Sequence, residues 1–268
     1  MRVFHRIVEA INALPFGRRV LRRLLFACVT EQKKSRFVAT IGGNIKLVLD
    51  LNQHLDKEYL VGEYDKDEIS FLQSFYEQGG AFVDIGANQG LYSLMFAKAF
   101  PDSTVVSFEP DPYSIRKFKE NIELNCLNNI TLIPYGLSDK VEVKKLMINT
   151  SANRAGSSMT YSQTPWTGEK EDTIIEVKCV TLLGALIENG VTRISSLKID
   201  VEGYEYPILN HFFRDAPVSL YPKAIILEAF GHVIPIVGGS SIELLVSRGY
   251  SLVNHIEYNY FFILRERR

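Results

Sequence analysis

Ala81-Phe-Val-Asp-Ile-Gly-Ala-Asn-Gln-Gly90 joins an apolar run to a glycine-rich turn, and a helical pattern follows from Leu91. A second apolar run, Thr104 to Phe108, ends in Glu109-Pro110. The order strand, acid, glycine turn, helix, strand, acid is typical of an α/β fold that binds a nucleotide at the carboxyl ends of its strands. We therefore expect Asp84 and Glu109 to stand at one edge of a parallel sheet.

The spacing of the glycines distinguishes between nucleotides. A dinucleotide fingerprint needs glycine at the first, third and sixth positions of the turn, where this chain has Gly86, Asn88 and Leu91. An NAD-dependent oxidoreductase is therefore the disfavoured alternative. An acid two residues before the first glycine suits a cationic ligand, and a carboxylate at Glu109 would accept hydrogen bonds from ribose hydroxyls. S-adenosylmethionine (SAM) carries both an ammonium and a ribose, so SAM is the predicted cofactor.

Glycine at positions 86 and 90 also has a predicted physical role. Without side chains, this turn would let backbone N–H groups approach the ligand and let the next helix pack closely on its strand.

The composition is that of an ordinary globular protein. The chain has 268 residues, 46% of them hydrophobic, and a net charge of -1, which fits one large α/β domain with an appendage. No overall charge excess indicates a nucleic-acid partner. The three cysteines are far apart in sequence and form no metal-binding pattern, so we expect reduced thiols and a cytoplasmic location. They are Cys28, Cys126 and Cys179.

The N-terminal segment is basic. Residues 1–36 contain nine lysines and arginines against two glutamates, which leaves a charge of +7. Apolar residues recur there at helical spacing. A helix pair that packs on its own domain is the favoured interpretation, and peripheral contact with the inner membrane face is the alternative. The apolar runs are far shorter than the ~20 residues that a membrane span needs.

Strand and helix patterns alternate after residue 80. This alternation predicts a mostly parallel seven-stranded sheet with helices on both faces and an antiparallel edge strand from a closing hairpin. Residues 140–180 interrupt it with two strand-like runs around a polar loop. We therefore expect N-terminal helices and a hairpin over residues 1–80, which pack on or cap the core, and a catalytic domain over 81–268 with a β insert at 140–180.

A second concentration of acids follows the later strands. Asp200 and Glu202 come directly after the apolar strand 195–200, and Glu228 ends the strand 224–228. In a parallel sheet these acids lie at the same edge as Asp84 and Glu109. Glu205 is also there, but a glutamate in the first turn of a helix is often explained by the helix dipole alone.

Four motifs together resemble the FkbM family of SAM-dependent methyltransferases. They are VDIGANQGLYSL (83–94), FEP (108–110), GLSD (136–139) and LKIDVEGYE (197–205). The resemblance covers roughly residues 47–227 and departs from the family at Thr181-Leu182-Leu183, where Thr-Leu-Asp is common. It implies a Rossmann-like methyltransferase fold and O-methylation of hydroxyls on sugars, glycans or polyketides.

The resemblance also assigns residues to the cofactor. The methionyl part would lie at the turn, the ribose at the second strand end and the adenine after the third strand. The cofactor-binding residues it implies are Asp84, Gly86, Ala87, Asn88, Gly90, Glu109, Pro110, Leu137, Ser138 and Asp139.

Transfer of a methyl group to an alcohol requires a general base or a metal, because an alcohol is barely ionised at neutral pH. Asp200, Glu202 and, less favoured, His232 are the candidate catalytic residues. Asp200, Glu202 and Glu228 are the alternative ligands of a Mg²⁺ ion, which prefers oxygen donors. The sequence leaves base and metal open.

The polar loop of the insert is the predicted acceptor site, because its amides and hydroxyls with nearby aromatic rings suit a sugar. The predicted substrate-binding residues are Asn153, Arg154, Ser157, Trp166 and Glu228. A small-molecule or glycan acceptor is expected, and a SAM-binding module without turnover remains an alternative. A nucleic-acid methyltransferase is disfavoured because the basic cluster lies at the far N-terminus.

Overall fold

The computed structural model describes residues 36–62, 65–148, 159, 173–229 and 237–265. The basic segment at residues 1–35, on which the membrane alternative rests, lies outside these ranges. None of the described helices is both long enough and apolar enough to cross a membrane.

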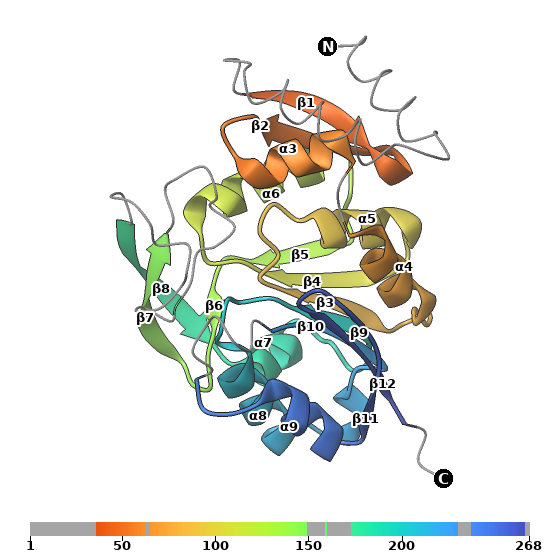
Figure 1. Ribbon diagram of the computed structural model, residues 1–268, viewed down its shortest axis with the longest axis vertical. Helices are drawn as coiled ribbons and strands as arrows, with labels where there is room; N and C mark the ends of the chain where they lie inside the picture. Colours follow the sequence, from red (N-terminus) through yellow and green to blue (C-terminus); the bar gives the residue numbers. More distant parts are fainter. Residues whose placement is uncertain (1–35, 63–64, 149–158, 160–172, 230–236, 266–268) are drawn as a thin grey trace.

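A seven-stranded sheet forms the centre of the molecule (Figure 1). Its strands lie in the order β11-β12-β10-β9-β3-β4-β5. The bounds are β3 (Ala81–Ile85), β4 (Thr104–Phe108), β5 (Ile130–Ile133), β9 (Ile194–Ile199), β10 (Ala224–Glu228), β11 (Tyr250–Ile256) and β12 (Asn259–Leu264). Five neighbouring strands, β10 through β5, are parallel. The predicted Rossmann-like α/β fold is confirmed.

The closing hairpin differs from its expected place. β12 runs antiparallel to both β10 and β11, so the antiparallel strand lies inside the sheet and β11 forms the edge. The hairpin turns at Glu257, whose φ of 51° lies in the left-handed region, and this tight turn brings the second strand back between the first and β10.

Helices cover both faces of the sheet (Figure 1). On one face pack α4 (Lys66–Ser74), α5 (Leu91–Ala99) and α6 (Pro112–Leu124), and on the other α7 (Leu182–Glu188), α8 (Glu205–Asp215) and α9 (Ser241–Ser247). Strand periodicity divides the core: Phe82 and Ile226 face the first set of helices, whereas Val83 and Ile225 face the second.

The described part of the N-terminal region forms a hairpin and two helices. β1 (Arg36–Ile41) and β2 (Ile45–Asp50) pair antiparallel around a 3-10 turn at Gly42–Asn44. α3 (His54–Val61) follows, and α4 is a separate helix, although the pattern predicted one mostly helical run.

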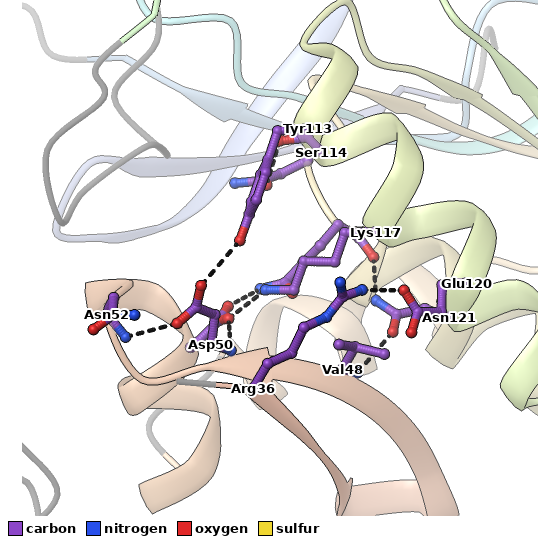
Figure 2. A network of polar contacts seen from close by, with 12 residues as sticks. Arg36, Val48, Asp50, Asn52, Tyr113, Ser114, Lys117, Glu120 and Asn121 are labelled. Atoms are coloured by element: carbon purple, nitrogen blue, oxygen red, sulfur yellow. Dashed lines mark hydrogen bonds and ion pairs between the residues drawn. The ribbon is translucent and has the colours of Figure 1, made fainter. Parts of the chain in front are cut away.

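Polar contacts join this hairpin to α6 (Figure 2). The backbone N–H of Val48 donates to Asn121 Oδ1 at 2.8 Å. Lys117 of α6 pairs with Asp56 of α3, and both side chains are buried. Arg36 pairs with Glu120 at the exposed rim of the same contact.

The insert forms a second, smaller sheet beside the main one. β7 (Glu142–Ile148) and β8 (Thr173–Val180) pair antiparallel, and β6 (Gly136–Leu137) adds to β8 in parallel. After β8, the hydroxyl of Thr181 accepts a hydrogen bond from Gly184 N and caps α7. The departure from the family pattern at this point therefore leaves the helix start intact.

Candidate functional site

A cavity of about 250 Å³ opens at the carboxyl ends of the parallel strands. Asp84, Glu109, Asp200 and Glu228 all line it, as expected for acids that end neighbouring parallel strands. The other lining residues are Leu55, Tyr59, Asp65, Ile85, Gly86, Ala87, Asn88, Leu91, Tyr92, Phe108, Pro110, Asp111, Ser114, Tyr135, Gly136, Leu137, Leu146, Met159, Lys198, Val201 and Glu202.

The turn after β3 needs glycine because neighbouring atoms come too close. Gly86 has φ of 79°, and a Cβ there would lie 1.8 Å from the carbonyl oxygen of Asp200. Gly90 has φ of 88°, and a Cβ there would lie 2.1 Å from the ring of Phe118 in α6. Close packing is present at both positions, but the neighbours are the end of β9 and α6, whereas the prediction named the following helix and its own strand.

Three backbone N–H groups of the turn, which were predicted to approach a ligand, have partners inside the fold. Gly86 N and Ala87 N both donate to the carbonyl oxygen of Phe108, each at 3.0 Å. Asn88 N donates to Glu109 Oε2 at 2.8 Å. These three donors are hydrogen-bonded within the fold, because the turn wraps around the end of β4. They are therefore not directed at a ligand.

Glu109 is held by backbone donors on both oxygens. Oε2 accepts from Asn88 N and Oε1 from Asp111 N, both at 2.8 Å. Each carboxylate oxygen has a second acceptor position, and the residue lines the cavity. Burial raises the pKa of Glu109 to about 7, although these two hydrogen bonds favour the charged form. The arrangement fits a pair of ribose hydroxyls.

Asp84 is 1% exposed and offers one oxygen without a partner. Its Oδ2 accepts from the hydroxyl of Ser93 at 2.5 Å, whereas its buried Oδ1 has no hydrogen-bond partner among the described residues. Burial raises the pKa of Asp84, although the ammonium of Lys198 acts in the opposite direction. A buried acceptor left without a donor is costly, so a cationic donor such as the ammonium of SAM fits this position.

The loop after β5 contributes its first residues to the cavity. Tyr135, Gly136 and Leu137 line it. The predicted adenine neighbours Ser138 and Asp139 are not among the lining residues. The hydroxyl of Ser138 donates to Asp139 Oδ1 at 3.0 Å and to Glu142 at 2.6 Å, so in this structure the pair organises the start of the insert.

The second acid cluster contains Lys198, which lies within the LKIDVEGYE motif but was given no role from the sequence. Lys198 lies two residues before Asp200 on β9, and its Nζ is 2.9 Å from Asp200 Oδ2. Burial alone would raise the pKa of Asp200, but Lys198 and hydrogen bonds from Glu228 and Lys198 bring it below its ordinary value. Burial and the nearby Asp200 raise the pKa values of Glu202 and Glu228 well above the ordinary range.

This lysine corrects the metal alternative. Within the described ranges, no group of three or more His, Cys, Asp or Glu side chains has an arrangement that suits a metal ion. The reason is visible at Asp200, because the ammonium of Lys198 already pairs with it and interacts with Glu228. The three acids Asp200, Glu202 and Glu228 do not form a Mg²⁺ site around a common centre.

Glu205 has a structural role at the start of α8. Its Oε1 accepts from Val201 N at 3.2 Å and Gly203 N at 3.0 Å. It thereby holds the turn in which Glu202 and Gly203 have φ of 55° and 99°. This turn directs Glu202 into the cavity lining.

The N-terminal region supplies cavity residues that the motifs did not predict. Leu55 and Tyr59 of α3 and Asp65 before α4 line the cavity. Tyr92 of α5 donates its hydroxyl to Asp65 Oδ2 at 2.7 Å. The sequence signal was weak, because α3 and α4 carry no motif and reach the cavity only through tertiary packing.

Five predicted residues lie outside the described residues: Asn153, Arg154, Ser157, Trp166 and His232. Their assignments stay predictions. Two described residues of the insert, Leu146 and Met159, line the cavity, so the insert does border the site.

Comparison with known proteins decides the family. Residues 84–232 match the methyltransferase FkbM domain, which is more than half of the chain. The chain belongs to the FkbM methyltransferase family. SAM is therefore its cofactor, and the predicted resemblance is confirmed.

Two curated relatives support this assignment. The chain is 26% identical over 171 residues to "Methyltransferase 1" of Beauveria bassiana, which covers 58% of this chain and 63% of the relative. It is 26% identical over 200 residues to "31-O-demethyl-FK506 methyltransferase FkbM" of Streptomyces tacrolimicus, which covers 65% of this chain and 74% of that protein. The chain thus spans less than two thirds of the Beauveria protein's length.

Among solved structures, the chain is similar to precorrin-6y C5,15-methyltransferase from Geobacter metallireducens, with a TM-score of 0.43 and 11% identity over 74% of this chain and 87% of that one.

Proposed function

We propose that this protein transfers a methyl group from SAM to a hydroxyl oxygen of a small molecule, and that the acceptor is a sugar, a glycan or a natural product. One observation carries the proposal: the cofactor acids Asp84 and Glu109 and the acids Asp200, Glu202 and Glu228 line the same cavity from neighbouring strand ends. A bound cofactor and an acceptor would therefore meet within one enclosed space.

The first two acids orient the cofactor. Asp84 would accept from the ammonium of the methionyl part through Oδ1, which has no partner among the described residues. Glu109, whose carboxylate is held by backbone donors, would accept from the ribose hydroxyls. When bound, SAM supplies an electrophilic methyl group. Holding the two reactants in line is worth ~7–11 kcal/mol of the barrier in well-oriented reactions, which makes this positioning a large part of the catalysis.

Asp200 is the best-placed proton acceptor. Among the three acceptor-side acids, it is the one whose surroundings lower the pKa and hold the carboxylate ionised. Asp200 would accept the hydroxyl proton of the acceptor as its oxygen is methylated, and S-adenosylhomocysteine would be the leaving group. Glu202 orients the acceptor, and His232 is the weaker alternative base.

A hydroxyl acceptor is supported by the cavity and by one relative. Carboxylates at the acceptor end suit the O–H donors of a polyol, and the polar insert residues Asn153, Arg154, Ser157 and Trp166 are proposed to bind it with Glu228. The Streptomyces relative is described as a 31-O-demethyl-FK506 methyltransferase, which names an oxygen as its target.

A methyl-transfer screen tests this proposal. Purified protein is incubated with SAM labelled in its methyl group and with a panel of glycans, free sugars and polyol natural products, and S-adenosylhomocysteine and labelled product are measured. We expect label on a hydroxyl oxygen of one acceptor class and loss of transfer in Asp200→Asn. Label on nitrogen or carbon would contradict O-methylation, and SAM binding without transfer across the panel would favour the module without turnover.

A further inference from the structure

Lys198 is a buried cation in the middle of a strand. It is 5% exposed and lies on β9, where the other side chains are apolar or serine. Its register partner on β3 is Asp84, so the two side chains leave the same face of the sheet on adjacent strands. Among the described residues that line the cavity, Lys198 is the one lysine or arginine.

The contacts of Lys198 are all with groups that favour its positive charge. Its Nζ lies 2.9 Å from Asp200 Oδ2 and 4.8 Å from the ring centre of Tyr92. Burial lowers the pKa of Lys198, but Asp200, Glu228 and Asp84 more than reverse this effect and raise it. The lysine therefore stays protonated throughout the range in which the protein works.

The position of this charge is informative. Carboxylates at neighbouring strand ends are oxygen donors of the kind that hold Mg²⁺, and a cation beside them offsets the repulsion that otherwise favours their neutral forms. A lysine ammonium is a compact charge with three donors. The Lys198 ammonium therefore supplies a positive charge beside these carboxylates without a metal.

We propose that Lys198 is the resident cation of the acceptor site, a positioning residue whose ammonium holds Asp200 where a divalent metal would otherwise bind. The protein therefore needs no divalent metal at this site. The description of this part of the cavity as the acceptor site rests on the proposed function. The charge arrangement itself is a property of the cavity.

Mn²⁺ binding tests this charge arrangement, and the measurement requires no acceptor. Manganese(II) chloride is titrated into the full chain, and free Mn²⁺ is measured by electron paramagnetic resonance. We expect no cavity site in the wild type or in Lys198→Arg, which keeps the charge. We expect a gain of one bound Mn²⁺ per chain in Lys198→Met and in Lys198→Gln, and its loss in the double variant Lys198→Met, Asp200→Asn.

Lys117 provides a matched control. It is as buried as Lys198 and also pairs with an aspartate, Asp56. Asp56 already accepts from Asp50 N and from the amide of Gln89, so Lys117→Met should gain no Mn²⁺. Circular dichroism shows which variants fold, and the two neutral substitutions of Lys198 give two chances of a folded protein.

Three outcomes would overturn the proposal. They are Mn²⁺ binding by the wild type that Asp200→Asn abolishes, no gain in a folded neutral variant of Lys198, and an equal gain in Lys117→Met. If every substitution of Lys198 unfolds the protein, the wild type and Asp200→Asn still give a test: Mn²⁺ binding by the wild type that Asp200→Asn abolishes contradicts the proposal, and the absence of such binding supports it. A parallel SAM titration distinguishes failure of the Lys198 proposal from failure of the proposed function. A folded protein that binds neither SAM nor Mn²⁺ would contradict the proposed function and leave the Lys198 proposal supported.

Discussion

The backbone N–H of Asn88 donates to the carboxylate of Glu109 over 2.8 Å, and this bond ties the glycine turn after β3 to the acid after β4. Asn88 has φ of 50°, a left-handed conformation that turns its N–H toward the neighbouring strand end. The acid thus shapes the turn and at the same time faces the cavity. The two halves of the motif are one structural unit.

The raised pKa of Glu109 predicts how the stability of the cofactor-free protein changes with pH. Its folded pKa of about 7 lies above the ordinary 4.5, so the stability it contributes is fully present below about pH 4.5 and is lost as the pH rises through 7. Glu109→Gln removes this loss. The free energy of unfolding of the variant, relative to that of the wild type, should therefore rise by about 2–3 kcal/mol between pH 5 and pH 8.

Urea unfolding of both proteins at the two pH values measures this gain. Any constant effect of the lost hydrogen bond cancels in the comparison. A difference between variant and wild type that does not change with pH would show that Glu109 is not the titrating group.

Gly90→Ala should destabilise the protein more than a glycine-to-alanine change alone. The left-handed φ costs an alanine about 1–2 kcal/mol, and contact with the ring of Phe118 adds about 1–3 kcal/mol of overpacking. Gly249→Ala is the control, because Gly249 has φ of +95° but a Cβ there would meet nothing within 4 Å. Equal free energies of unfolding in the two variants would contradict the close packing of α6 on the turn.

Lys117→Met should cost about 3–5 kcal/mol of unfolding free energy, because it leaves the buried Asp56 without its cation. Lys140→Met removes an exposed partner of Glu142, at 3.7 Å, and should cost no more than about 1 kcal/mol. Thermal and urea unfolding compare the two. A similar cost would mean that the Lys117–Asp56 pair does not stabilise the contact between α3 and α6. Figure 2 shows the polar contacts around Lys117.

The strand-end acids were predictable because two-residue strand periodicity and parallel pairing place them at one edge. Asp84, Glu109, Asp200 and Glu228 were found this way. Lys198 was not, although a lysine inside an otherwise apolar strand and on the same face as Asp200 was a readable signal. Tyr59 could not be predicted from the sequence as a cavity residue, since only the packing of α3 brings it to the cavity.

The predicted ligand-facing role does not fit the N–H groups of Gly86, Ala87 and Asn88, for a similar reason. Local sequence showed that the glycines were needed, but not that Phe108 O would accept from both Gly86 N and Ala87 N. That partner belongs to the next strand and is set by the sheet. The contacts of Ser138 with Asp139 and with Glu142 of the insert were likewise not indicated by its motif.

Calorimetric titration of SAM into the wild type and into Glu109→Ala tests the central claim most directly. The wild type should bind one SAM per chain and not bind NAD, and the variant should bind SAM well over tenfold more weakly, because two ribose hydrogen bonds to a carboxylate at about 1.5–3 kcal/mol each are lost. Unchanged SAM affinity in Glu109→Ala, with the fold intact, would contradict the proposed cofactor site.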